Sequence, residues 1–178
     1  MTNAMAAVYA DALYELCAET GVCDEVLAQT KTVSQALKDN KDFIKVLDAP
    51  AITKDEKISL LDGIFSNNVH RYLLNCMKVM VKRGDGAALP GTLAEFEKRY
   101  NRANNIEKAV AVTAVPMSEA QSEKLRAKLR QVTGKTILLE NRVDESLIGG
   151  VILEMDEKQY DDSIKSKLAA LNKQLKNN

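Results

Sequence analysis

The spacing of apolar residues changes near Asn104-Asn105, and this change restricts the possible folds more than any other feature of the sequence. Before it, apolar residues recur every three or four positions, which is the period of an amphipathic helix. After it, short runs rich in Val, Ala, Ile or Leu are typical of strands. The 178 residues are enough for two small domains. We therefore expect a mainly α protein, with a six-helix bundle over residues 1–105 and a small α/β domain over residues 106–178.

End signals place the helices of the first half. Gly21 and Gly84 follow periodic segments and are typical of residues that end a helix. Thr53 and Glu56 form a capping box, which opens a helix. The predicted helices cover about 4–20, 24–38, 43–47, a segment opened by the capping box, 67–83, and a segment beginning near Pro90.

The second half has its own end signals. Ser118 and Gln121 form another capping box, and Gly134 is placed to end the helix that they open. A further helix is expected to begin near Asp161. The predicted strands are 108–115, 135–140 and 151–155, so the order is strand, helix, strand, strand, helix.

Composition excludes several classes of protein. The 25 basic and 25 acidic residues cancel, and aromatic residues make up 4% of the chain, which argues against a general nucleic-acid binder. One His and three scattered Cys lack the spacing of a metal site, so we expect no metal and no cofactor. No apolar run approaches the ~18 residues of a membrane span. Residues 1–30 hold no base, so no basic targeting segment is expected either.

The motifs that suggest catalysis are incomplete. The Gly-Lys-Thr of 134–136 has Leu129 where a phosphate-binding loop needs Gly, and a helix precedes it where a strand is required. Gly149-Gly150 lacks the third glycine of a dinucleotide site. His70 has no neighbouring nucleophile in the sequence and is interpreted as a packing residue. We therefore expect no catalytic residues, and nucleotide hydrolysis at 134–136 is the weaker alternative.

Two of the predicted helices, 4–20 and 67–83, are apolar around too much of their circumference for a peripheral helix. At about 100° per residue, one arc of the first helix is the expected core face, and a second arc carries mostly small residues. Two explanations stay open: both helices are buried on nearly all sides, or the second arc receives a partner helix. The core arc is Met5, Val8, Tyr9, Ala12, Leu13 and Leu16; the second arc is Ala7, Ala10, Tyr14, Cys17 and Ala18; the acidic line is Asp11, Glu15 and Glu19.

Several segments together resemble the delta subunit family of bacterial ATP synthases, which is related to the mitochondrial oligomycin-sensitivity-conferring protein. The resemblance runs through the whole chain in order, and its most specific part is the C-terminal half. The residues that carry it are Tyr9 to Leu13, Gly21, Pro50 to Thr53, Lys57, Val112 to Ser118, Gly134-Lys135, Val143-Asp144, Leu147, Ile148, Gly149, Gly150, Asp162, Ser163, Ile164 and Leu168.

The resemblance implies a non-catalytic subunit of the peripheral stalk, or stator, on the cytoplasmic face of the cell membrane, which it contacts only through the complex. It implies that residues 1–105 receive the N-terminal helix of an alpha subunit between the first and fifth helices, and that residues 106–178 engage the b subunits. The residues we then expect to contact the alpha-subunit helix are Ala7, Ala10, Tyr14, Ala18, Leu74 and Val81. An adaptor or regulatory protein of another complex is the main alternative.

Overall fold

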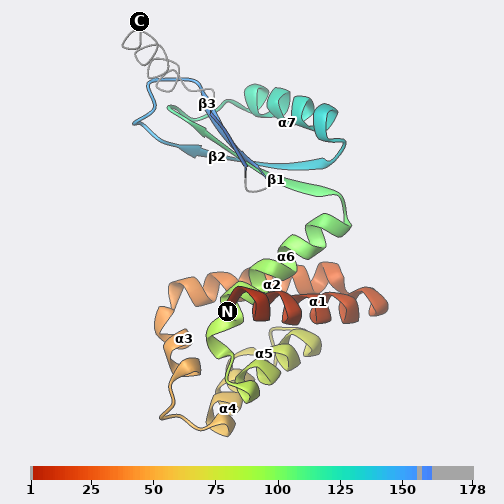
Figure 1. The fold of residues 1–178 in the computed structure, drawn as a ribbon, viewed down its shortest axis with the longest axis vertical. Helices are drawn as coiled ribbons and strands as arrows, with labels where there is room; N and C mark the ends of the chain where they lie inside the picture. Colours follow the sequence, from red (N-terminus) through yellow and green to blue (C-terminus); the bar gives the residue numbers. More distant parts are fainter. Residues whose placement is uncertain (1, 156–157, 162–178) are drawn as a thin grey trace, which may run out of the picture. The chain divides into compact units, whose positions relative to one another are not determined.

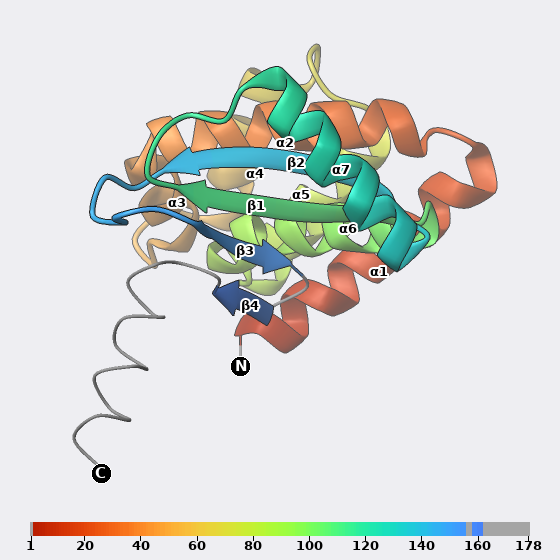
Figure 2. The same cartoon turned by 90° about the horizontal axis from the view of Figure 1, so that it is seen from above.

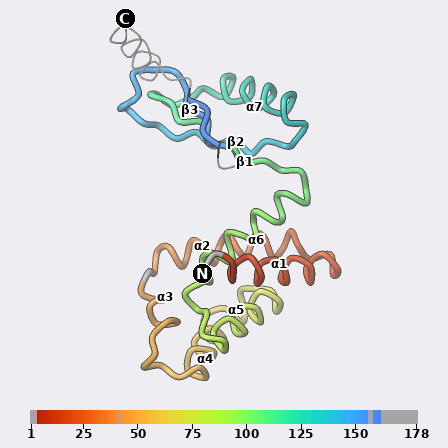
Figure 3. The backbone as a smooth tube through the Cα atoms, viewed as in Figure 1, coloured from red at the N-terminus to blue at the C-terminus, as the bar shows by residue number. Residues whose placement is uncertain are grey.

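The computed structural model describes residues 2–155 and 158–161. The chain separates into two compact units, Met1–Ala103 and Asn104–Asn178, each with its own internal contacts. The path of the chain through each unit can be followed in Figures 1 and 3. Of the helix expected to begin near Asp161, the part from Asp162 and Ser163 onward lies outside the described residues, and Asp161 itself ends a strand.

The first unit is helical in its described part, and its helices lie where the end signals predicted them. Its elements are α1 (Thr2–Thr20), α2 (Cys23–Asp39), α3 (Lys41–Asp48), α4 (Lys54–Phe65), α5 (Arg71–Arg83), the 3-10 turn η1 (Gly86–Ala88) and α6 (Leu89–Ala103). None of the described helices has the length and apolar character needed to cross a bilayer.

Local hydrogen bonds explain several of these boundaries. The Thr53 side chain accepts from the Glu56 amide, and the Glu56 carboxylate accepts from the Thr53 amide at 2.9 Å, which completes the predicted capping box. Gly84 ends α5 with φ +86°, a left-handed conformation that glycine adopts at little cost. The start of α5 was predicted near Asn67 but lies at Arg71, because Nδ1 of His70 accepts from the Tyr72 amide and caps the helix there.

The core of the first unit is aliphatic, with Phe96 as its largest fully buried side chain. The most extensive contact between two helices of the first unit is that between α1 and α6. A methyl group on Gly91 would lie 3.3 Å from the Cβ atom of Ala6, so the two helices approach closely at that point. Only small side chains fit into so close a helix contact, and this explains why Ala6 and Ala10 are buried there.

The second unit is a four-stranded sheet with one described helix on it. Strand β1 pairs in parallel with β2 and antiparallel with β3, and β3 pairs antiparallel with β4, which gives the order β2-β1-β3-β4. Figure 2 shows α7 lying across one face of this sheet, where Leu129 packs on Ala109 and Ile137. The elements are β1 (Ile106–Thr113), α7 (Glu119–Thr133), β2 (Thr136–Val143), β3 (Val151–Met155) and β4 (Lys158–Asp161).

The predicted strands and the capping box of α7 are confirmed, and one strand was missed. Strand β4 is short, and all its residues are exposed, so it shows no apolar alternation in the sequence. The fold is therefore mainly helical with a small four-stranded sheet in its C-terminal part.

Candidate partner-binding surfaces

The buried side of α1 is only partly the one expected: Tyr9 and Leu13 of the predicted core arc are buried, whereas Met5, Val8, Ala12 and Leu16 of that arc are exposed. Cys17 and Ala10 belong to the arc predicted to meet a partner, yet they lie in the core with Tyr9 and Leu13. Val8 was expected in the core, but 64% of its side chain is exposed. Close packing of α1 on α6 at Gly91 and Ala6 favours small residues such as Ala10 on the side of α1 that faces α6.

The residues predicted to touch a partner helix are consequently placed in different environments. Ala10, Leu74 and Val81 are buried within the first unit, so their side chains have almost no surface to offer to a partner. Ala7 and Tyr14 are half-buried and Ala18 is exposed, and for these three the contact stays a prediction.

Tyr14 is held against α6. Its ring centroid lies 6.2 Å from that of Phe96, and the Arg99 guanidinium lies 5.7 Å from the Tyr14 centroid. Asp11 pairs with the same guanidinium at 3.4 Å. Much of the Tyr14 ring is therefore used to join α1 to α6.

The exposed side of α1 forms an apolar surface with two acids in it, which we call the α1 strip. Met5, Val8 and Leu16 are exposed large hydrophobic residues, and they share one side of the helix with Ala12 at the spacing of successive turns. Glu15 and Glu19, also exposed and four residues apart, lie on the same side. The α1 strip is Met5, Val8, Ala12, Glu15, Leu16 and Glu19.

Helix α5 packs against α1 in the first unit. The Tyr9 hydroxyl donates to the Asp85 carboxylate at 2.6 Å, which ties α1 to the end of α5. Burial and the Asp85 carboxylate raise the pKa of Tyr9, so this hydroxyl keeps its proton. Val79 of α5 is exposed, whereas Met77 and Met80 are in the core. The two helices with extended apolar surface are therefore neighbours; α1 exposes Met5, Val8 and Leu16, and α5 exposes Val79.

The first unit holds three free thiols, of which Cys17 is buried and Cys23 and Cys76 are half-buried. Burial raises the pKa of Cys17 to about 12 and that of Cys76 to about 11, and it also raises the pKa of Cys23. The thiolate is the reactive form of cysteine, so none of the three is suited to act as a nucleophile at neutral pH. The described residues contain no group of three or more ligand side chains arranged to hold a metal.

The Gly-Lys-Thr segment is a helix end followed by a strand start. Gly134 ends α7 with φ +68°, and Thr136 begins β2. The Lys135 ammonium pairs with the Glu107 carboxylate at 2.6 Å, which uses the group that would contact a phosphate. The segment therefore has the local structure that the sequence favoured over a nucleotide site.

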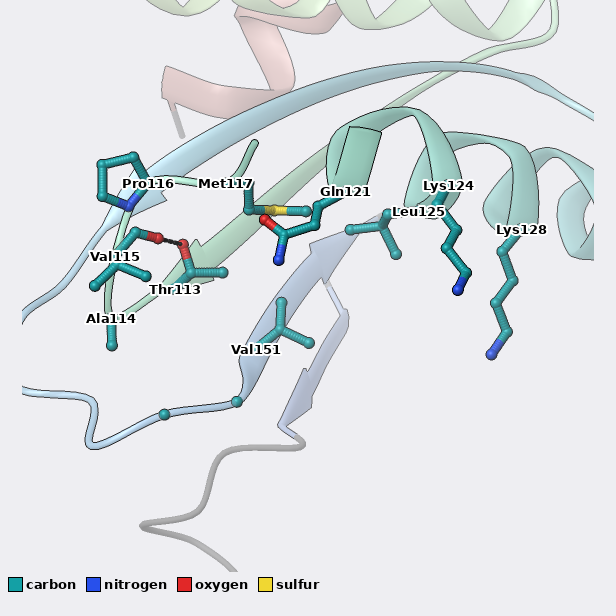
Figure 4. Close-up of a pocket in the computed structure, with 12 residues that line it drawn as sticks. Thr113, Ala114, Val115, Pro116, Met117, Gln121, Lys124, Leu125, Lys128 and Val151 are labelled. Carbon is teal, nitrogen blue, oxygen red and sulfur yellow. Dashed lines mark hydrogen bonds between the residues drawn. The ribbon is translucent and has the colours of Figure 1, made fainter. Parts of the chain in front are cut away.

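The second unit contains a cavity of about 450 Å³, which we call the α7 cavity. The loop after β1, one side of α7 and the start of β3 enclose it (Figure 4). Two motifs of the family resemblance, Val112 to Ser118 and Leu147 to Gly150, contribute to its wall although they lie about 30 residues apart. The lining residues are Thr113, Ala114, Val115, Pro116, Met117, Gln121, Lys124, Leu125, Lys128, Gly149, Gly150 and Val151.

The wall of the α7 cavity is fixed by polar contacts behind it. The Asn141 side chain donates to the Ala111 carbonyl at 2.8 Å and to the Thr113 hydroxyl at 2.9 Å. Its oxygen accepts from the Met117 amide at 2.8 Å. The Thr113 hydroxyl donates in turn to the Val115 carbonyl at 2.7 Å. One side chain of β2 thus holds both ends of the loop after β1.

The four residues of the Leu-Ile-Gly-Gly motif lie in different environments. Leu147 is buried, Ile148 is exposed, and Gly150 has φ +88°, where a side chain would be strained. The sequence alone did not indicate the cavity beside this segment. The signal that could have indicated it was that Val112 to Ser118 and Leu147 to Gly150 both combine small and apolar residues. The pairing of β1 with β2 and β3 brings these two segments together.

Comparison with known proteins assigns the family. The family described as ATP synthase delta (OSCP) subunit matches residues 5–175. The chain is 34% identical over 176 residues to the ATP synthase subunit delta of Clostridioides difficile, covering 98% of this chain and 97% of that protein. It is 34% identical over 167 residues to that of Alkaliphilus oremlandii, covering 94% and 93%. A chain in the cryo-EM structure of the Toxoplasma gondii mitochondrial ATP synthase hexamer has the same fold, with a TM-score of 0.75, 22% identity and 96% of each chain covered. On this full-length match, the chain belongs to the ATP synthase delta (OSCP) subunit family.

Proposed function

We propose that this chain is a non-catalytic subunit of the peripheral stalk of a rotary ATP synthase. It joins the catalytic head to the stalk, so that rotation driven by hydrogen ions is coupled to ATP synthesis. The observation that carries the proposal is the family match over residues 5–175, supported by relatives that cover nearly the whole chain. Such a role requires stable contacts with two partners, and nanomolar binding corresponds to about −12 kcal/mol.

The first unit is proposed to bind the head. In this proposal, α1 to α6 form a six-helix bundle that holds the N-terminal helix of an alpha subunit along the α1 strip and the neighbouring side of α5. Exposed apolar residues at helical spacing fit the recognition of an amphipathic helix in a groove. Glu15 and Glu19 in the strip favour a partner helix with basic residues.

The second unit is proposed to bind the b subunits of the stalk. The chain then lies at the cytoplasmic face of the membrane and contacts the membrane only through the complex. No nucleic acid and no cofactor takes part in this role. The two units are proposed to act independently, because each has its own core.

The test is binding of the full chain to the purified head complex of the source organism. The tagged chain should retain alpha and beta subunits. Val8→Gln and Leu16→Gln should weaken that binding at least tenfold, because they place polar groups in a buried apolar contact. Val132→Gln and Leu138→Gln are matched controls, since both residues are exposed and lie in the second unit.

Retention of other proteins, with no alpha or beta subunit, would show an adaptor of another complex and contradict the proposal. Equal retention by the α1 variants and the controls would keep the stalk role and reject the α1 strip as the contact.

A further inference from the structure

The α7 cavity is built for an apolar group. Val115, Met117, Leu125 and Val151 line it, and 69% of the Val115 side chain is exposed. Its volume of about 450 Å³ lies within the range of about 300–1,000 Å³ that is typical of ligand pockets. When an apolar group of a ligand enters such a cavity, both apolar surfaces leave water, and this stabilises the complex.

Hydrogen bonds within the second unit fix the wall of the α7 cavity. Asn141 fixes the loop after β1 by three hydrogen bonds, and the Ser118–Gln121 capping box fixes the start of α7. A preformed site loses little conformational entropy when it is filled, which favours tight binding.

The charge at the cavity is positive. Lys124 and Lys128 extend side by side from α7, on the same side of the helix as Gln121 and Leu125 (Figure 4). No acidic residue lines the cavity, and both lysines are exposed without an acidic partner among the described residues. A ligand with carboxylates beside its apolar group complements this surface.

The spacing of the two lysines indicates that the carboxylates of the ligand lie on a helix. Positions i and i+4 are separated by about one helical turn, which is also the separation of two carboxylates at i and i+4 of a second helix lying beside α7. The chain's own C-terminal segment has the wrong charge, because residues 163–178 hold four lysines and no acid.

We infer that the α7 cavity is the docking site for an acidic amphipathic helix of a stalk subunit. An apolar side chain of that helix fills the cavity, and two carboxylates one turn apart pair with Lys124 and Lys128. The inference rests on the proposed function, and it names the surface and the chemistry of the contact between the second unit and the stalk.

The test uses the full chain and two separate binding assays. One assay measures binding to the purified head complex. The other measures binding to membrane vesicles of the source organism from which the head complex and the native copy of this chain have been removed. The double variant Lys124→Glu/Lys128→Glu should lose at least tenfold in affinity for the vesicles and keep its affinity for the head. Lys158→Glu, also exposed and in the second unit, should bind like the parent chain.

A second pair of variants tests the apolar part of the contact. Val115→Gln lies in the cavity wall and should weaken binding to the vesicles, whereas Val132→Gln lies on α7 outside the cavity and should not. Val132 is 78% exposed, so both substitutions are made at exposed positions and should leave the thermal unfolding midpoint unchanged.

The outcomes separate the two proposals. If the parent chain binds neither the head nor the vesicles, the proposed function fails and the inference fails with it. If the parent chain binds both and the lysine variant binds the vesicles equally well, the inference alone is overturned. If the full chain self-associates in sedimentation and the lysine variant abolishes this, a second copy occupies the cavity through its acidic α1 strip, and the stalk helix is rejected.

Discussion

The two units carry surfaces of the same design and opposite charge. The α1 strip combines exposed apolar residues with Glu15 and Glu19, whereas the α7 cavity combines an apolar wall with Lys124 and Lys128. In both, the charged residues are four positions apart on one helix. A net charge of zero therefore conceals two local charges of opposite sign, and each unit favours a partner that the other would repel.

The units also differ in their cores. The first unit has a core cluster with side chains from all six helices α1 to α6, among them Leu61, Leu73, Met77 and Phe96. In the described part of the second unit, the cluster is Ala109, Leu129 and Ile137, with four half-buried residues against it. Separate cores mean that a substitution in one unit should not alter the stability of the other.

The largest expected effect tests this separation. Phe96→Ala removes a fully buried ring and the aromatic partner of Tyr14, so it should lower the unfolding free energy of the first unit by about 3–5 kcal/mol. Urea unfolding followed by amide hydrogen exchange reports each unit separately. Ile137→Ala is the corresponding change in the second unit. A common shift of both units in either variant would contradict separate cores.

The second effect concerns the charge of the α1 strip. The double variant Glu15→Lys/Glu19→Lys should bind the head complex at least tenfold more weakly, which is about 1.4 kcal/mol, because it repels a basic partner helix. Titration calorimetry at low and high salt measures this. Asp48→Lys is the control, since Asp48 is an exposed acid at the end of α3. Tighter binding by the double variant would show that the partner is acidic.

The capping boxes give a smaller effect, one in each unit. Thr53→Ala should destabilise the first unit by about 1 kcal/mol and Ser118→Ala the second by a similar amount, because each leaves a helix amide without its acceptor. Thr53→Ser retains the hydroxyl and should be nearly neutral. Hydrogen exchange of α4 and α7 assigns each loss to its unit, and a loss in the wrong unit would contradict the comparison.

The smallest expected effect is a difference between the two capping boxes in how their contribution to stability depends on pH. Hydrogen bonds from the Thr53 side chain and amide lower the pKa of Glu56, whereas the equivalent residue of the other box is the uncharged Gln121. A lowered folded-state pKa adds stability that is present above the unfolded pKa of about 4.3 and is lost as pH falls through the folded value.

The cost of Thr53→Ala should therefore shrink between pH 7 and pH 3, while that of Ser118→Ala stays constant. Denaturant unfolding of both variants and the parent over this range measures the difference. A constant cost for Thr53→Ala would show that the Glu56 carboxylate does not contribute to the cap.

The sequence was sufficient for most helix boundaries because their signals are local. Thr53 with Glu56, Ser118 with Gln121, and Gly84 act through bonds within a few residues. The start of α5 was misplaced because a His70 ring nitrogen acts as the cap, which is an uncommon choice. Strand β4 was missed because it is defined by pairing with β3 rather than by its own residues.

The faces of α1 could not be predicted from the helix alone. Both arcs are apolar, and what selects between them is the approach of Gly91 to Ala6, which lies in another helix. The α7 cavity is non-local in the same way, since Asn141 must bring the loop after β1 into place. Surfaces formed between distant segments depend on contacts between helices and strands, which the spacing of apolar residues in the sequence does not reveal.

Asn141 has a consequence for how this protein can vary during evolution. Its side chain bonds to the Met117 amide, the Ala111 carbonyl and the Thr113 hydroxyl at once, so an aliphatic replacement would remove all three hydrogen bonds. Residues of the loop after β1 should therefore covary with the residue at position 141 among related sequences. Lineages that alter one should show compensating replacements at the other, even though 24 residues separate Asn141 from Met117.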